Sequence, residues 1–248
     1  MDQDNALVWA DGAPAGAGAW FEPYARRFND ILHEAGVPYC KGGIMANNPL
    51  WRGSEEQWRA RVDHWILYSS PEGLLSVDIF FDLRVAHGDR ALGERLWRYG
   101  FDLAQGRPDF AKLLIATLGA APPVRGWLGN FRTEKGRIDL KRSGLFGVVS
   151  IARALAVRHH VSERSTASRL NGLIERKIGL EDDLDDLLDA QSTFLDLVLK
   201  QQIEDITRGY PAGNTVEIKS LSRRERASLK GALQAVENLD EIARTLLF

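Results

Sequence analysis

The sequence predicts an α+β protein of two domains: a small mixed sheet with helices over residues 1–105, and an all-α helical bundle over 106–248. Runs of strand character alternate with helical periodicity in the first part. All seven tryptophans lie at or before Trp127, and later apolar residues recur at helical steps. A chain of 248 residues is long enough for two domains with their own cores.

The composition is that of a soluble globular protein, with 27% charged and 44% hydrophobic residues. A net charge of −2 gives no basis for binding DNA or an anionic membrane. No run reaches the ~18 apolar residues that a membrane span requires. The single cysteine, Cys40, cannot form an internal disulfide, so a reducing cytoplasm is the expected compartment.

The first residues place two carboxylates on one side of an expected β-strand. Asp2 and Asp4 flank Gln3, and alternate strand residues share a face, so the two Asp Cα atoms would lie about 6.5–7 Å apart. That spacing suits two carboxylates sharing divalent cations about 3.5–4 Å apart. The alternative is an ordinary solvated chain end. The strand continues over residues 6–9, before a loop containing glycine and proline.

A helix is predicted from residue 19 to a stop at Gly36. Its apolar stripe has three- and four-residue steps, which favours packing in the core over a platform for stacking bases. The members of this stripe are Trp20, Phe21, Tyr24, Phe28, Ile31 and Leu32.

A second short strand is expected over residues 37–40, followed by the turn Lys41-Gly42-Gly43. Adjacent glycines let backbone N–H groups approach an anion, and the lysine adds a positive charge. The turn is therefore a candidate phosphate site, with a plain turn as the alternative. Cys40 is expected to be a buried thiol.

Residues 74–84 are predicted to form the strongest strand of the chain, because apolar residues occupy every second position. A carboxylate on such a strand is costly unless a metal or another cation compensates it. Asp82 is therefore a candidate metal ligand, whereas Asp78 could instead pair with a nearby arginine.

Polar residues predict where several helices begin. Ser54 with Gln57, and Ser222 with Glu225, have the spacing of capping boxes. Asp89 is a natural N-cap for a helix through residue 103. The acids of 181–186 lie in the first turn of a helix, where they complement the helix dipole and need no bound calcium.

Beyond residue 106 the sequence predicts four or five helices whose apolar stripes face inward. They run over 109–118, which Pro122 and Pro123 end, and through 148–155, 170–174, 187–198 and 229–242. Lys141 and Arg142 precede the second of these helices and are candidates for phosphate contact, with a solvated turn as the alternative.

Three groups of residues occur in the order seen in a known family. They are Asp2-Gln3-Asp4-Asn5-Ala6-Leu7-Val8, Cys40-Lys41-Gly42-Gly43 with Asn47-Asn48-Pro49, and Ile79-Phe80-Phe81-Asp82-Leu83-Arg84. Together they resemble the DUF294 nucleotidyltransferases related to bacterial protein-PII uridylyltransferase. The resemblance implies a polymerase-β-like nucleotidyltransferase domain followed by a helical C-terminal domain. Members often carry cyclic-nucleotide-binding or CBS domains upstream.

The resemblance also implies an active site. It assigns the catalytic and metal-binding acids to Asp2, Asp4 and Asp82, and nucleotide binding to the Lys41-Gly42-Gly43 turn with Lys141. The implied reaction moves a nucleoside monophosphate from a nucleoside triphosphate to an acceptor, such as a PII-like protein, and releases pyrophosphate. Two Mg²⁺ ions would neutralise the charge that develops on the phosphates.

The chain departs from the family at its start. The family places a Gly-Ser turn and a helix with Arg and Glu upstream of the Asp pair, where this chain has Met1. We therefore expect an N-terminally truncated fragment with weak or no transferase activity. The alternatives are a non-catalytic regulatory module that binds nucleotide or protein, and a metal-dependent phosphohydrolase.

Overall fold

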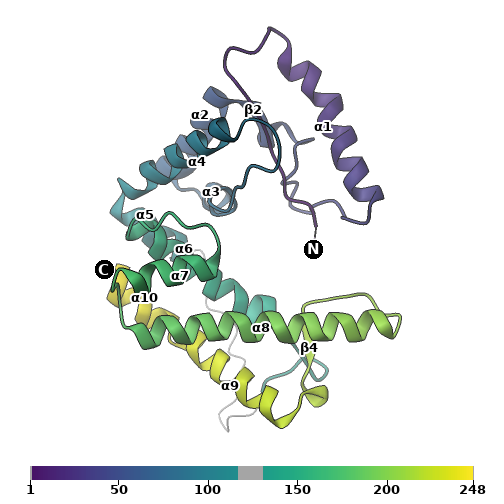
Figure 1. Cartoon of the computed structure of the whole chain (residues 1–248), viewed down its shortest axis with the longest axis vertical. Coiled ribbons are helices and arrows are strands. Elements are labelled where there is room, and N and C mark those ends of the chain that lie inside the picture. Colours follow the sequence, from purple (N-terminus) through teal and green to yellow (C-terminus); the bar gives the residue numbers. More distant parts are fainter. Residues whose placement is uncertain (1, 117–130, 248) are drawn as a thin grey trace. The chain divides into compact units, whose positions relative to one another are not determined.

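The computed structural model describes residues 2–116 and 131–247, which are mostly helical and contain two small sheets (Figure 1). The chain divides into two compact units. The first comprises Met1–Gly73 and Leu83–Leu103, and the second comprises Leu74–Asp82 and Ala104–Phe248. The division at residues 105 and 106 stays a prediction, as does a polymerase-β-like sheet.

The elements that build the first unit are β1 (Leu7–Trp9), α1 (Ala17–Glu34), the 3₁₀ turn η1 (Pro49–Trp51), β2 (Arg52–Ser54), α2 (Glu55–Tyr68) and most of α4 (Arg90–Gln105). Strand β1 was predicted, and it pairs in parallel with β2, with Val8 opposite Gly53. The strand predicted over 37–40 is wrong. Only Tyr39 forms a bridge there, to Gln3, because the neighbouring Pro38 has no N–H to extend a ladder.

Helix α1 ends where predicted, but its apolar stripe is not in the core. Gly36 has a φ of +94°, and the Val37 N–H closes the helix end on the Leu32 carbonyl at 2.9 Å. Trp20 and Tyr24 are 65% and 51% exposed. The buried face instead carries Ala25 and Asn29. The expectation of core packing was wrong for most of the stripe. Phe21 stacks on Trp9 with ring centroids 5.1 Å apart, but the fully buried polar residue of the inner face is Asn29, which hydrogen-bonds to Gln3 and Asn5.

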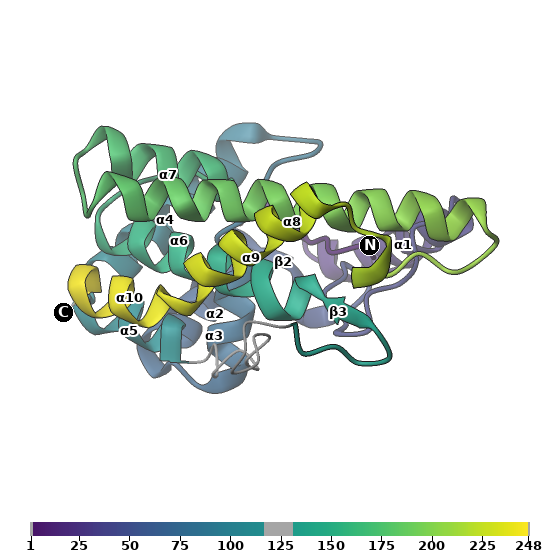
Figure 2. The ribbon, with the colours of Figure 1, turned by 90° about the horizontal axis from the view of Figure 1, so that it is seen from below.

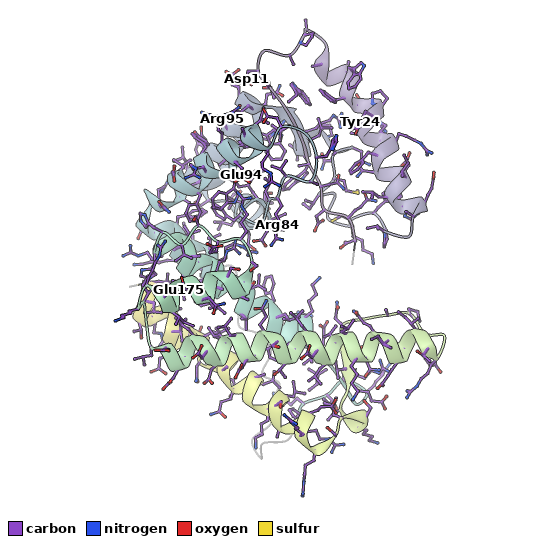
Figure 3. All side chains as sticks on the ribbon, in the orientation of Figure 1. Asp11, Tyr24, Arg84, Glu94, Arg95 and Glu175 are labelled. Atoms are coloured by element: carbon purple, nitrogen blue, oxygen red, sulfur yellow. The ribbon has the colours of Figure 1, made fainter. Side chains whose placement is uncertain are left out.

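Three tryptophans form the aromatic core of the first unit. Trp58 lies 5.8 Å from Trp51 and 6.2 Å from Trp65 between ring centroids. The buried Trp58 donates from its indole N–H to the Leu7 carbonyl at 3.1 Å, which ties α2 to β1. Figure 3 labels Asp11, whose carboxylate accepts from the Glu56 N–H at the start of the same helix.

The strand predicted over residues 74–84 is wrong, because residues 71–80 form helix α3 (Pro71–Phe80). The buried residues are Leu74, Val77, Phe80 and Phe81, which follow helical steps of three and four. Ser70 accepts from the Gly73 N–H, and Pro71 occupies a first-turn position that needs no N–H. Ser70 and Pro71 thus both favour the start of a helix, whereas the alternation of apolar residues favours a strand. The helix is the structure that forms.

The rest of the second unit is a helical bundle with one small hairpin. Its elements are α5 (Pro108–Ala116), β3 (Arg137–Asp139), the π-helical turn η2 (Lys141–Leu145), α6 (Phe146–Arg158), α7 (Thr166–Glu175), α8 (Glu181–Thr207), β4 (Thr215–Glu217), the 3₁₀ turn η3 (Ile218–Ser220), α9 (Arg223–Glu237) and α10 (Leu239–Leu247). The bundle was predicted. The predicted end of α5 at residue 118, with Pro122 and Pro123, lies outside the described residues.

Two details of that prediction were wrong. The unit is not all-α, because β3 and β4 pair antiparallel and bury Ile138 opposite Val216. Residues 137–139 are too few for a helical pattern but enough for one inward side chain between two outward ones. The last helix is also two helices, since α9 ends at Glu237 with Asn238 as its C-cap and α10 begins at Leu239.

Helices α8 and α9 lie side by side through the second unit (Figure 2). Phe194 of α8 is fully buried beside Gly144 of η2, where a Cβ atom would stand 2.5 Å from the ring. The predicted capping boxes at Ser54 and Ser222 are both present. Asp89 caps α4, and the acids at the start of α8 lie in its first turn.

Candidate functional site

Gln3 anchors the first residues of the chain in the first unit. Its backbone N–H donates to the Pro38 carbonyl at 3.0 Å. Its side-chain amide donates to the carbonyls of Asn29 and Val37, at 3.0 and 3.2 Å. The side chain is 4% exposed. Residues 2–4 are therefore held in place by the hydrogen bonds of Gln3 and do not form a frayed terminus.

Asp2 and Asp4 flank this anchor, and both are exposed. The alternation of exposed, buried and exposed residues is what an extended backbone produces. Asp4 also contacts the Cys40 thiol. Partial burial raises the pKa of Cys40, and its hydrogen bond to Asp4 raises it further, because both disfavour the thiolate. Cys40 is half-buried.

The predicted phosphate turn lies next to Asp4. The Gly43 N–H donates to the Cys40 carbonyl at 3.1 Å, and Gly43 has a φ of +70°. The Gly42 N–H points to the Cys40 thiol and acts to lower its pKa. Lys41 is exposed at the tip of the turn. In this conformation the turn presents the lysine charge outward, while these two N–H groups bond within the turn.

Asp82 lies in the second unit, just after α3. One carboxylate oxygen is 2.5 Å from Nη2 of Arg153 and the other is 2.8 Å from Nη2 of Arg169. Asp78, one helical turn earlier, pairs with the other amino group of Arg153. The two arginine side chains are 4% and 2% exposed, whereas Asp82 is 44% exposed. The pairing of Asp78 with an arginine was one of the two predicted alternatives.

The two carboxylates keep Arg153 charged inside the unit. Burial by itself lowers the pKa of Arg153, but the charges of Asp78 and Asp82 raise it above the usual value. Two buried donors of this cluster, Nε of Arg153 and Nη1 of Arg169, have no partner among the described residues. The cluster holds the end of α3 against α6 and α7.

The acids that the family resemblance assigns to one site are divided between the units, with Asp2 and Asp4 in the first and Asp82 in the second. Among residues 2–116 and 131–247, no group of three or more His, Cys, Asp or Glu side chains is arranged to hold a metal ion. Asp2 and Asp4 alone still fit Mg²⁺, which is commonly bound through one or two carboxylates together with phosphate oxygens.

Comparison with protein family models shows the family to which the chain belongs. Residues 108–246 match the family model described as "Putative nucleotidyltransferase substrate binding domain", and residues 1–72 match "Putative nucleotidyltransferase DUF294". The first match alone covers more than half of the chain. The chain belongs to this nucleotidyltransferase family. No curated protein and no solved structure matches it.

The two family segments assign the site residues to different parts of a nucleotidyltransferase. Asp2, Asp4 and the Lys41 turn lie in the segment that matches the nucleotidyltransferase model. Lys141 is exposed on η2 within the segment that matches the substrate-binding domain. Arg153 lies there too. No described helix is both long and apolar enough to cross a membrane.

Sequence reasoning missed two buried polar residues near these acids, one that binds the residues flanking Asp4 and one that pairs with Asp82. Asn29 is fully buried on the inner face of α1. Arg153 lies within a run of buried apolar residues of α6. Both had a visible signal, since a polar residue at a core position of an amphipathic or apolar helix requires a buried partner.

Proposed function

We propose that the chain is the Mg²⁺-dependent catalytic part of a nucleotidyltransferase, with uridylyl transfer to a PII-like protein as the specific activity. The observation that carries this proposal is the exposed pair Asp2 and Asp4 on either side of the buried, hydrogen-bonded Gln3. Family membership supports nucleotidyl transfer in general. A hydrogen-bonded anchor between two carboxylates pre-organises them for a shared ligand.

Asp2 and Asp4 would hold the metal, which supplies charge neutralisation at the triphosphate. In the reaction, an oxygen of the acceptor forms a bond to the α-phosphorus and loses its proton. The bond from the α-phosphorus to the bridging oxygen breaks, and pyrophosphate leaves. The exposed Lys41 beside the Asp pair would attract the triphosphate. Lys141, in the segment that matches the substrate-binding domain, stays a candidate for nucleotide binding.

Asp82 is the third acid that the family resemblance assigns to the metal. The groups around it determine how much it can contribute to metal affinity. Both of its carboxylate oxygens are engaged by buried arginines. A metal would have to compete with two positive charges for this group. We therefore expect Asp82 to contribute less to metal affinity than Asp4.

Metal binding by the purified 248-residue chain tests this proposal. Mn²⁺ replaces Mg²⁺, and electron paramagnetic resonance measures free Mn²⁺ with and without UTP. We expect Asp4→Asn to weaken binding by at least about tenfold, because one of two carboxylate ligands is lost. Asp102→Asn, which changes an exposed acid of α4, is the matched control.

Two outcomes would overturn the assignment. Mn²⁺ affinity that is unchanged in Asp4→Asn would remove the metal role of the pair. UTP binding that needs no divalent ion and survives Asp4→Asn would instead support a non-catalytic nucleotide-binding module. For the uridylyl specificity, any transfer by this chain, which we expect to be weak, should carry label from the α-phosphate of UTP to a PII-like protein. An equal or greater transfer from ATP would contradict it.

A further inference from the structure

Three side-chain amides in the first unit form a hydrogen-bond network next to the acidic pair Asp2 and Asp4. They belong to Gln3 and Asn5 of the N-terminal segment and to Asn29 of α1. Asn29 donates to Oε1 of Gln3 at 2.7 Å and to Oδ1 of Asn5 at 2.9 Å. Asn5 donates to Gln3 at 3.3 Å. Gln3 returns a hydrogen bond to the Asn29 carbonyl.

The network also holds the loop that faces the N-terminal segment. Oδ1 of Asn29 accepts from the Asn47 N–H at 3.0 Å, and Oδ1 of Asn5 accepts from the Ala46 N–H at 3.0 Å. The Asn5 N–H donates to the Ile44 carbonyl at 3.0 Å. Both donors and the acceptor of the Asn29 amide are thus used, and its side chain is fully buried.

We propose that Asn29 is a positioning residue that sets the spacing and direction of the Asp2 and Asp4 carboxylates. The inference rests on the proposed metal role of that pair. The Asn29 amide binds the side chains of Gln3 and Asn5, the two residues that flank Asp4. The backbone N–H groups of the same two residues are bonded to Pro38 and Ile44. Asp2 and Asp4 are exposed on either side of the buried Gln3. If the Gln3 side chain lost its hydrogen bonds, the extended backbone that presents both acids would be held less firmly.

Only an amide satisfies this position. A leucine at residue 29 would leave Oε1 of Gln3, Oδ1 of Asn5 and the Asn47 N–H without partners in a buried site. An aspartate would place an acceptor against two acceptor oxygens. The requirement for two donors and one acceptor in a fixed plane explains a polar residue at the centre of the inner face of α1.

The test compares three variants with the wild-type chain. Asn29→Ala removes the network, and Asn5→Ala removes part of it at a half-buried residue that is easier to tolerate. Val62→Ala, in the buried face of α2, destabilises the same unit without touching the network. The readouts are Mn²⁺ affinity, thermal stability, and the {¹H}–¹⁵N NOE of the Asp2 and Asp4 amides.

We expect Asn29→Ala to raise the Mn²⁺ dissociation constant by about ten- to a hundredfold, as losses of groups that orient metal ligands do. Asn5→Ala should act in the same direction, and the NOE of Asp4 should fall in both. Val62→Ala should keep wild-type affinity and NOE at an equal or larger loss of thermal stability. Wild-type affinity in both asparagine variants, or an equal loss in Val62→Ala, would overturn the inference.

The NOE separates this inference from the proposed function. If the wild-type chain binds no Mn²⁺, the proposed metal role fails. The positioning of the two acids by Asn29 is then decided by whether the Asp2 and Asp4 amides lose order in Asn29→Ala and Asn5→Ala. Unchanged order in both variants overturns it. If Asn29→Ala does not fold, Asn5→Ala decides both measurements.

Discussion

The carboxylate of Asp82 lies 2.5 Å from the buried guanidinium of Arg153 and closes an ion-pair cluster within the second unit. Asp78 occupies the other side of the same guanidinium. The two acids are four residues apart at the end of α3, so they face the same way and bracket one cation. This pairing gives Asp82 a structural partner that the sequence had not assigned to it.

Arg153→Leu should strongly destabilise the second unit. The substitution removes the cation between two carboxylates, and breaking a buried ion pair in this way costs about 3–5 kcal/mol. Arg158→Leu, at an exposed position of the same helix, should change stability by no more than about 0.5 kcal/mol. Urea unfolding followed by far-UV circular dichroism measures both. Similar losses in the two variants would contradict a buried role for Arg153.

Two glycine substitutions should change the free energy of unfolding in opposite directions. Gly144→Ala would place a Cβ atom 2.5 Å from the buried Phe194 ring and should cost about 1–3 kcal/mol, because the packed ring cannot move without strain. Gly231→Ala lies on the exposed side of α9 with no atom within 4 Å of the new Cβ. It should stabilise the chain by about 0.5–1 kcal/mol through helix propensity. Urea unfolding midpoints measure the two effects, and the same sign in both would contradict the packing of η2 on α8.

The stability of the folded chain should decrease as the pH falls, partly because Glu225 becomes protonated. Its hydrogen bond with Lys200, and then those with Ser222, lower the pKa of Glu225 from 4.5 to about 2. A lowered folded-state pKa contributes stability that is fully present above 4.5 and is lost as the pH falls toward 2. Glu225→Gln keeps the capping box but has no charge to titrate. The wild-type melting temperature should exceed that of Glu225→Gln above pH 5, and the difference should disappear near pH 2. A difference that does not change with pH would contradict the ion pair.

The reactivity of the Cys40 thiol should depend on the carboxylate of Asp4. Burial first, and the hydrogen bond to Asp4 second, raise the pKa of Cys40. At pH 7–8 the thiolate should therefore be scarce, and its reaction with a disulfide reagent slow. Asp4→Asn removes the negative charge, so the pKa should fall and the reaction should accelerate. Rates in Asp102→Asn serve as the control, and equal rates in all three proteins would place Asp4 away from the thiol.

Local signals predicted several features of the chain correctly. Ser54 with Gln57 and Ser222 with Glu225 form their capping boxes because each box involves only residues three positions apart. The stop of α1 at Gly36 likewise depends on a few neighbouring residues. The apolar run of residues 7–9 was enough to predict β1, although its partner β2 is distant in the chain. The helical character of the second half follows from periodicity over many turns, which a single competing residue cannot change.

Features that depend on distant partners could not be predicted in the same way. The segment 74–84 contains both a strand pattern and a helical pattern, and the helix is formed because Leu74, Val77 and Phe80 find a packed surface. The stripe of α1 looks like a core face, yet the buried face is the one that carries Asn29. The partner that makes Asn29 acceptable is Gln3, which lies 26 residues away.

By itself, the sequence determined the caps, the helical second half, the family to which the chain belongs, and the alternation that exposes Asp2 and Asp4. Each follows from local periodicity, local hydrogen bonds or ordered motifs. Only the tertiary structure decided that Asn29 binds Gln3 and Asn5 and that Arg153 and Arg169 bind Asp82. Those choices depend on burial, because a buried amide or charge is stable only where a distant partner compensates its lost hydration.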